Sequence, residues 1–233
     1  MFRVGSWYKV EGNHMNFSFH REKLLSGLGG AVSIFLVFWI TQQFEQGLEA
    51  RLLLIASMGA TAVLLFAAPG STFSQPWNVV GGHVVSAFIG VLVHQQVGDP
   101  VLGGALAVGF AITAMYYLKC LHPPGGATSL IPLIGGSVID SYGLAFVLFP
   151  VGAGAILMVL IAIAFNYPLS WRRYPAGLAE NTAAKGDGYP DISHADFVAA
   201  LSEIDTFVDI SERDLLKIYQ IASRRPHPDI DVV

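Results

Sequence analysis

The chain has 233 residues, of which 53% are hydrophobic and only 13% are charged. Average domains carry about 25% charged residues, and the mean hydropathy of +0.55 disfavours an ordinary soluble enzyme. The composition excludes a disordered chain. The single cysteine, Cys120, excludes a disulfide scaffold and a four-thiolate zinc site.

Charge divides the chain into two regions. Residues 1–174 carry eight basic and six acidic side chains, whereas residues 175–233 carry five basic and eleven acidic ones. We therefore expect a transmembrane domain over 1–174 and an acidic, soluble helical tail over 175–233. This charge distribution offers no basic surface for nucleic acid, so we expect no nucleic-acid partner.

Long uncharged stretches predict membrane spans, because each can cross about 27 Å or more of hydrocarbon as a helix. The five clear stretches are residues 24–41, 52–68, 79–97, 101–118 and 142–166. A sixth, 120–139, is interrupted by prolines and glycines, so no regular helix can fill it. The first apolar run exceeds the roughly 7–15 residues of a signal peptide, so we expect it to stay in the mature protein.

If the broken stretch crosses the membrane, nearly all the basic residues of the membrane domain lie on one side. Short cytoplasmic loops are enriched in Lys and Arg, so this side is the cytoplasmic one. We therefore expect six membrane segments in the lipid bilayer, both termini cytoplasmic, and a location in a bacterial inner membrane. The other side then holds Arg51 with four carboxylates. The residues on the basic side are Arg3, Lys9, Arg21, Lys23, Lys119, Arg172 and Arg173.

Two stretches carry the same tripeptide, Gly59-Ala60-Thr61 and Gly126-Ala127-Thr128, and a small-residue turn follows each. Three segments per half would place the two halves in opposite orientations. This pattern favours an all-α fold built as a 3+3 inverted repeat with broken half-helices. The alternative is a chance recurrence in a chain rich in these three residues.

The sequence around Pro123-Pro124 ends any incoming helix and suits the start of a new one near Gly125. A helix start presents free N–H groups and a partial charge of about +0.5, which attracts anions. If 59–61 is a second helix start, two opposed ends would bind a small monoanion without a cationic side chain. The hydroxyls of Thr61 and Thr128 could add directed hydrogen bonds.

No Asp or Glu lies inside the proposed spans, and the ionisable side chains at depth are His83, His94 and His122. Each is either functional or a hydrogen-bonded packing residue. His83 and His94 are about 16 Å apart along a helix, and Cys120 with His122 gives two ligands at most. We therefore predict no metal and no cofactor. We find no catalytic triad, so we predict no enzyme.

The chain resembles the HPP family of integral membrane proteins, named for the tripeptide seen here as His122-Pro123-Pro124. The resemblance covers residues 20–170 and rests on residues 121–128, on Gly59-Ala60-Thr61 with 65–69, and on 75–83. It implies membrane transport, with nitrite as the substrate of plant plastid and cyanobacterial relatives. The family is usually described with four spans, which differs from the six expected here.

These arguments select one set of residues for binding the solute and another for shaping the backbone around them. Asn78 belongs to the first set, although its role could equally be to cap the third span. The predicted substrate-binding residues are Gly59, Ala60, Thr61, Asn78, His83, His122, Gly125, Gly126, Ala127 and Thr128. The predicted structural motif residues are Pro69, Gln75, Pro76, Gly81, Gly82, Pro123 and Pro124.

The leading prediction is a transporter or channel for a small inorganic monoanion, most of all nitrite. The alternatives are a neutral-solute pore and a non-transporting membrane sensor or scaffold that acts through the acidic tail. Apolar periodicity predicts two short amphipathic helices in that tail, beginning near Ser193 and Ser211. We expect the tail to meet a CBS-like domain or partner, and small-residue faces to support a homo-oligomer.

Overall fold

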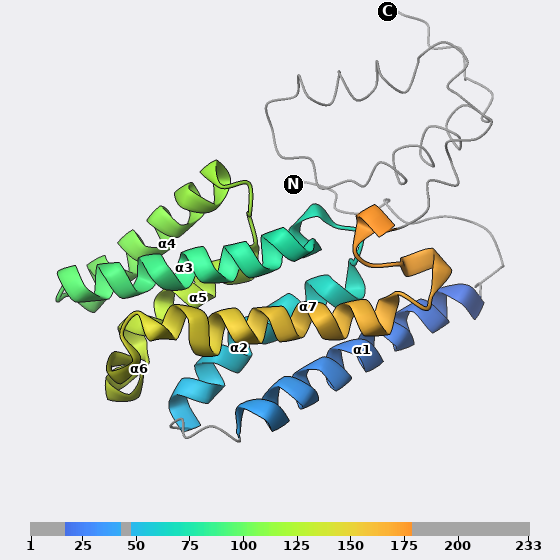
Figure 1. The fold of residues 1–233 in the computed structure, drawn as a ribbon, viewed down its shortest axis with the longest axis horizontal. Coiled ribbons are helices and arrows are strands. Elements are labelled where there is room, and N and C mark those ends of the chain that lie inside the picture. Colours follow the sequence, from blue (N-terminus) through green and yellow to red (C-terminus); the bar gives the residue numbers. More distant parts are fainter. Residues whose placement is uncertain (1–16, 43–47, 179–233) are drawn as a thin grey trace, which may run out of the picture.

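The computed structural model describes residues 17–42 and 48–178, and the predicted tail helices lie outside them. All regular structure in these residues is helical (Figure 1). Short 3-10 turns cover Thr72–Ser74, Ser170–Arg172 and Ala176–Leu178. The longer helices are α1 (Phe17–Thr41), α2 (Leu48–Ala67), α3 (Pro76–Gln96), α4 (Pro100–Tyr117), α5 (Pro123–Ile134), α6 (Gly136–Tyr142) and α7 (Ala153–Asn166), the last preceded by a π-helical segment, η2 (Val147–Gly152).

Successive long helices run in alternating directions along the long axis of the bundle (Figure 1). Within residues 17–42 and 48–178, four helical stretches are long and apolar enough to cross a membrane, which agrees with the predicted all-α class. The apolar part of α2, Leu53–Ala67, is shorter. At 12 residues, α5 rises about 18 Å, less than the roughly 30 Å of bilayer hydrocarbon. The four stretches are His20–Thr41, Pro76–Gln96, Pro100–Tyr117 and Val147–Asn166.

The interrupted stretch folds as two short helices, as its prolines and glycines predict. Helix α5 begins with Pro123 and Pro124, whose fixed φ suits a first helical turn. It ends at Ile134 with Gly135 as its C-cap, and Gly136, at φ 66°, redirects the chain into α6. The expected helix start near Gly125 is therefore confirmed, two residues earlier than predicted.

The expected second helix start at Gly59-Ala60-Thr61 is wrong. These residues lie inside α2, which is continuous from Leu48 to Ala67. The tripeptide contains no proline, and a single glycine costs a helix only about 1 kcal/mol relative to alanine. The helix ends only where Pro69 and Gly70 follow it. Two opposed helix ends are therefore absent from the site.

Helix α3 packs closely against α5 and the segment that precedes it, because glycines remove the side chains between them. A Cβ atom added at Gly90 would lie 2.3 Å from the backbone oxygen of Ser129. One added at Gly82 would lie 2.5 Å from the Cβ of His122, and one at Gly81 2.9 Å from the Cβ of Cys120. No larger residue fits at these positions without moving backbone.

A second group of helices, α1, α2 and α7, is joined by the guanidinium of Arg172. This buried side chain forms an ion pair with Glu22 of α1 at 3.0 Å and donates to Asn166 Oδ1 of α7 at 3.0 Å. It also donates to the carbonyl of Phe66 at the end of α2. A buried arginine with a charged partner and two carbonyl-type acceptors is well satisfied.

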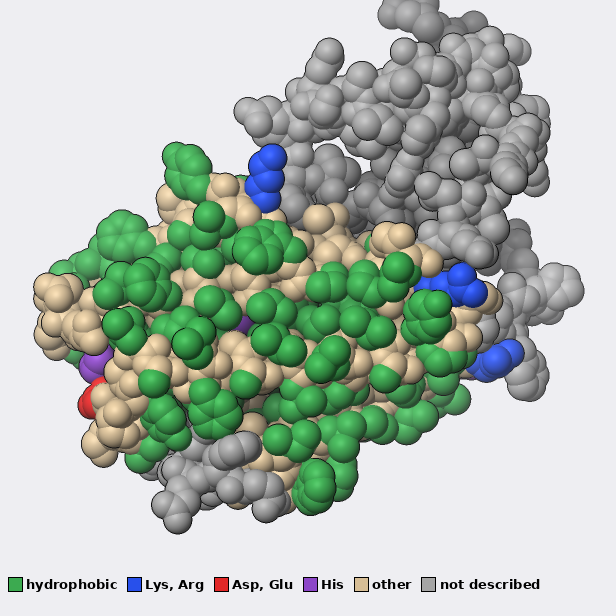
Figure 2. Space-filling view, in the orientation of Figure 1, with side chains coloured by type: hydrophobic (Ala, Val, Ile, Leu, Met, Phe, Trp, Pro, Cys, Tyr) green, Lys and Arg blue, Asp and Glu red, His purple; other side chains and the backbone are tan. Residues whose placement is uncertain are grey.

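Apolar side chains cover the visible sides of the bundle (Figure 2). Basic side chains appear at the end where α1 begins and on the upper edge, and a histidine and an acidic side chain appear at the end opposite the start of α1 (Figure 2). An apolar belt between polar ends is the surface expected of a chain that spans a bilayer.

Replacing Gly90 by alanine should lower the free energy of unfolding by about 1–3 kcal/mol, because the new methyl group meets backbone. Gly109→Ala on α4 is the matched control, since no heavy atom lies within 4 Å of the added carbon. That variant should be neutral or more stable by up to about 1 kcal/mol. Denaturant unfolding in detergent micelles measures both, and equal stability of the two would contradict the packing argument.

The variant Arg172→Lys should lose about 1–3 kcal/mol, because a lysine cannot reach all three partners and leaves buried acceptors unpaired. Arg21→Lys, on the exposed surface of α1, should change stability by less than about 0.5 kcal/mol. The same unfolding measurement compares them. An Arg172→Lys variant as stable as the wild type would show that the three contacts do not hold these helices together.

Candidate functional site

Five polar side chains meet in the interior, where α2, α3 and α5 come together. Ser57 and Thr61 lie on α2, His83 on α3, His122 at the N-cap of α5 and Thr128 in the second turn of α5. Each is at most 1% exposed. We call these five residues the polar cluster.

The cluster is one continuous hydrogen-bonded chain. Ser57 Oγ lies 2.6 Å from Thr128 Oγ1, which lies 2.7 Å from His83 Nδ1. The other ring nitrogen, His83 Nε2, lies 2.8 Å from Thr61 Oγ1, which lies 3.0 Å from His122 Nε2. The two threonines of the recurring Gly-Ala-Thr tripeptide therefore contact the two nitrogens of one imidazole.

The carbonyl of Phe73 sets the direction of these bonds. It lies 2.8 Å from His122 Nδ1 and can only accept, so Nδ1 of His122 carries a proton. In the neutral ring, His122 Nε2 is then an acceptor, and the Thr61 hydroxyl donates a hydrogen bond to it. Thr61 in turn accepts from His83 Nε2–H.

The remaining links follow from the tautomer of His83. Its Nδ1 is an acceptor for the Thr128 hydroxyl, and Thr128 accepts from Ser57. The carbonyl of Pro124 lies 3.1 Å from Ser57 Oγ and 3.3 Å from Thr128 Oγ1 as a further acceptor. With both imidazoles neutral, every polar side-chain atom of the cluster is satisfied, as burial requires.

Neighbouring residues hold the segment before α5 against α3. The indole N–H of Trp77 donates to the carbonyl of Leu118 at 3.1 Å, and Asn78 Nδ2 donates to the carbonyl of Leu121 at 2.9 Å. The prediction that Asn78 caps the third span is wrong, because Gln75 is the N-cap and Pro76 begins the helix. Asn78 instead positions the backbone next to His122.

The structure brings together four of the predicted binding residues, Thr61, His83, His122 and Thr128. The glycine and alanine of the α2 tripeptide lie elsewhere: Ala60 is exposed and Gly59 lines a groove between α1 and α2. On α5, Gly125 is buried, and a Cβ atom added to it would lie 2.7 Å from Ser86 Oγ. Gly126 is half-buried and Ala127 is exposed.

The predicted structural motif residues shape the loops at one end of the cluster. Pro69 is buried, and its carbonyl accepts from Gln75 Nε2 at 3.2 Å. Gln75 Oε1 accepts from the backbone of Ala176 at 2.9 Å. Gly81 and Gly82 allow the close approach of α3 to the segment before α5. The remaining three motif residues are prolines in the first turn of a helix: Pro76 in α3, and Pro123 and Pro124 in α5.

Ser57 and the carbonyls of Phe73 and Pro124 are not among the binding residues predicted from the sequence. Ser57 lies four residues before Thr61, a spacing that places both hydroxyls on one helix face, and this was the available signal. The carbonyls could not be found from residue types, because every residue carries one.

The start of α5 offers fewer backbone donors than predicted. Pro123 and Pro124 have no N–H, and the N–H of Gly125 donates to the carbonyl of His122 at 2.8 Å. The partial positive charge of the helix end remains. The directed donors at this site are therefore side-chain hydroxyls and imidazoles rather than backbone amides.

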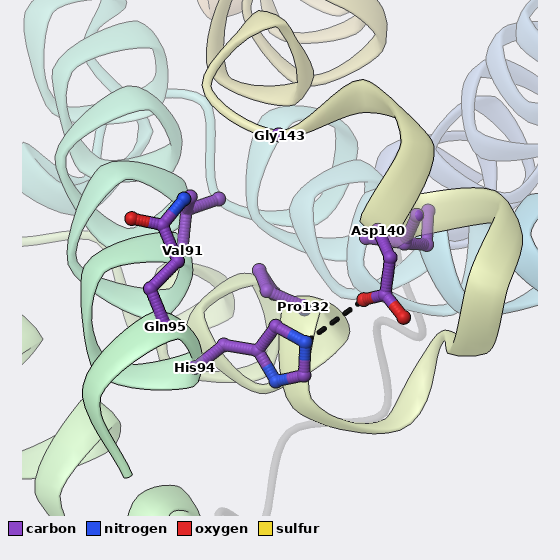
Figure 3. Close-up of a pocket in the computed structure, with 7 residues that line it drawn as sticks. Val91, His94, Gln95, Pro132, Asp140 and Gly143 are labelled. Carbon is purple, nitrogen blue, oxygen red and sulfur yellow. Dashed lines mark hydrogen bonds and ion pairs between the residues drawn. The ribbon is translucent and has the colours of Figure 1, made fainter. Parts of the chain in front are cut away.

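A separate pocket of about 230 Å³ opens at the far end of α3 (Figure 3). There His94 Nε2 of α3 lies within hydrogen-bond distance of Asp140 Oδ1 of α6, at 2.8 Å, and both side chains are partly exposed. His94 is eleven residues from His83, about 16 Å along the helix, so it is not part of the cluster. Residues 17–42 and 48–178 bring together no group of three His, Cys, Asp or Glu side chains that could hold a metal.

Sequence comparisons agree with a membrane domain. A family model described as the HPP transmembrane region matches residues 16–175. Two transmembrane proteins of Dictyostelium discoideum are similar, one 35% identical over 65% of this chain and one 37% identical over 55% of it. This chain covers 48% and 49% of their respective lengths. No solved structure matches the chain.

Removing the Thr128 hydroxyl should destabilise the protein, because it leaves Ser57 Oγ and His83 Nδ1 without their shared partner. We expect Thr128→Val to lower the free energy of unfolding by about 1–3 kcal/mol. Thr113→Val is the matched control, since Thr113 is exposed and bonds only its own helix at Gly109. Detergent unfolding that showed equal stability for both would contradict the cluster geometry.

Proposed function

Because this chain belongs to the HPP transmembrane family, we propose that it is a transporter or channel for a small inorganic monoanion, with nitrite as the favoured substrate. The two similar Dictyostelium proteins are named only as transmembrane proteins. The choice of an anion therefore depends on the chemistry of the polar cluster, and nitrite in particular on the resemblance to family members that carry it.

The observation that carries this proposal is a fully buried set of rotatable hydrogen-bond donors inside an apolar bundle. Three hydroxyls, on Ser57, Thr61 and Thr128, and two imidazoles form one chain of bonds, and no link is longer than 3.0 Å. A small oxyanion accepts hydrogen bonds only, and hydroxyl groups can turn to donate to it. The start of α5 adds a partial positive charge of about +0.5.

The cluster contains no lysine or arginine. From residue 52 to residue 118 the chain has neither, and it has a single acidic side chain, Asp99, which caps α4 at the far end of α3. A site without a fixed cationic side chain can bind an anion and release it again, which a transporter requires. This composition also supports a solute that is small and weakly held.

We further propose six membrane segments, with α5 and α6 as the broken one, arranged as a 3+3 inverted repeat. The two repeated threonines support this, because Thr61 from one half and Thr128 from the other contact the same imidazole of His83. The basic residues of the membrane domain other than Arg51 then face the cytoplasm together with both termini. A bacterial inner membrane suits this orientation.

Purified protein in liposomes, supplied with nitrite, nitrate, formate and chloride, tests the proposal. We expect saturable uptake of nitrite by the wild type and by Thr113→Val. Uptake by Thr128→Val and Thr61→Val should fall by about tenfold or more, because each loses a hydrogen bond to a charged solute. Protein-free liposomes measure passive leakage.

Two results would contradict this assignment. Normal uptake by both Thr128→Val and Thr61→Val would show that the cluster is not the path of the anion. Osmotic swelling with neutral solutes, without saturable uptake of any of the four anions, would identify a neutral-solute pore instead.

A further inference from the structure

We propose that the polar cluster binds one proton for each anion, so that the protein moves the anion together with a proton. This inference rests on the anion transport proposed above and deepens it. Its physical basis is that the same five side chains can form a complete set of hydrogen bonds in two states that differ by one proton.

In the first state both imidazoles are neutral and the bonds run in one direction. Ser57 donates to Thr128, and Thr128 donates to Nδ1 of His83. Nε2–H of His83 donates to Thr61, and Thr61 donates to Nε2 of His122. Nδ1–H of His122 donates to the carbonyl of Phe73, which ends the chain.

A proton that arrives at the Ser57 hydroxyl can convert this state into the second. Ser57 passes its own proton to Thr128, which passes its proton to Nδ1 of His83. His83 then passes its Nε2 proton to Thr61, and Thr61 passes its proton to Nε2 of His122. Each of the first four groups gives one proton and receives one, and His122 gains one and becomes an imidazolium.

Every bond is satisfied again in the second state, now with the opposite direction along the cluster. His122 Nε2–H donates to Thr61, Thr61 to His83 Nε2, and His83 Nδ1–H to Thr128. The Thr128 hydroxyl is released from His83 and can donate to Ser57, to the carbonyl of Pro124 at 3.3 Å, or to a bound anion. The same steps in reverse return the proton to the Ser57 end, so anion and proton can leave together.

Burial explains why the proton and the anion belong together. An anion without a countercharge at this depth is expensive, because the interior of a membrane protein solvates charge poorly. The bonded groups are Ser57 and Thr61 from α2, His83 from α3, Thr128 from α5, the Phe73 carbonyl from η1 and His122 from the segment before α5, and Cys120 lies close by on that segment. His83, His122 and Cys120 are the titratable groups among them, and a proton on an imidazole is the cation that these groups can provide.

One end of the cluster lies close to the surface. His122 Nδ1 donates to the carbonyl of Phe73. Phe73 is a half-buried residue, and the adjacent Thr72 is exposed. At the other side, the His94–Asp140 pair is about 16 Å away along α3, with the tight glycine contact at Gly90 in between. The cluster therefore lies nearer the η1 end of the protein than the pocket at His94.

Simultaneous measurement of nitrite uptake and internal pH in liposomes tests the inference. With one proton per anion, uptake carries no net charge, so an inside-negative potential set by valinomycin and a tenfold potassium gradient should not reduce accumulation. Transport of the anion alone should accumulate about tenfold less under that potential. Uptake of nitrite together with a proton should lower the internal pH. Nitrous acid that crosses the lipid unaided also lowers it, so the pH change in liposomes with Thr128→Val is subtracted as the baseline.

The variant His83→Gln tests the relay itself, because glutamine can hydrogen-bond but cannot exchange one tautomer for the other. Any anion uptake that it retains should become sensitive to the potential and should no longer acidify the interior. His94→Gln makes the same change on the same helix outside the cluster and should keep the wild-type coupling.

Nitrogen-15 NMR of histidine-labelled wild-type protein gives a readout that a purely structural role would not produce. The signals distinguish Nδ1–H, Nε2–H and imidazolium forms. We expect His83 to change from the Nε2–H to the Nδ1–H tautomer as His122 becomes protonated on acidification. A His83 tautomer that stays unchanged through this titration would overturn the inference.

The transport results separate the two proposals. Saturable nitrite uptake that follows the membrane potential and leaves internal pH at the Thr128→Val baseline would overturn the proton coupling and leave anion transport standing. Absence of uptake for every anion would overturn both.

Discussion

The close contact between α3 and α5 is the constraint on which the rest of this structure depends. At Gly90 and Gly82 the helix approaches backbone and Cβ atoms so closely that no side chain fits between them. This approach places His122 beside His83, with ring centroids 4.9 Å apart, and brings Thr128 to the far side of the His83 ring. Without it the hydroxyls of α2 would face no partner from α5.

Polar groups inside a membrane protein have no water to complete their hydrogen bonds, so they must satisfy one another. The polar cluster does so with side chains of modest polarity and with backbone carbonyls at both ends. Two prolines at the start of α5 help to satisfy the hydrogen bonds of the cluster. Pro123 and Pro124 remove N–H groups that would otherwise need partners at the start of α5, and the carbonyl of Pro124 accepts from the cluster.

Much of the fold could be predicted from hydropathy and from helix-breaking residues. The starts and ends of α3 and α4 lie within a few residues of the expected spans, and the break at Pro123-Pro124 falls where proline chemistry requires it. The break expected at Gly59-Ala60-Thr61 does not exist. It was inferred from likeness to residues 126–128, but only the second copy follows prolines, and glycine alone does not end a helix in an apolar segment.

The candidate site could be predicted in part, because an ionisable or hydroxyl side chain in an apolar span is conspicuous. Thr61, His83, His122 and Thr128 were recognisable in this way. Their mutual arrangement was not, since it depends on how α2 meets α5 across 67 residues of sequence, as the bond from Ser57 to the Pro124 carbonyl shows. The role of Asn78 was missed for the same reason: its partner, the carbonyl of Leu121, is distant in the chain.

Arg172 has a consequence for how this molecule can move. It fastens α1, α2 and α7 to one another, whereas the glycine contacts hold α3 and α5 together. The hydrogen bonds of Ser57 and Thr61 to His83, His122 and Thr128 link these two groups of helices, together with apolar contacts of α3 with η2 and α7. A motion that separated the two groups would break these hydrogen bonds, so the side chains proposed to hold the solute also join the two halves of the bundle.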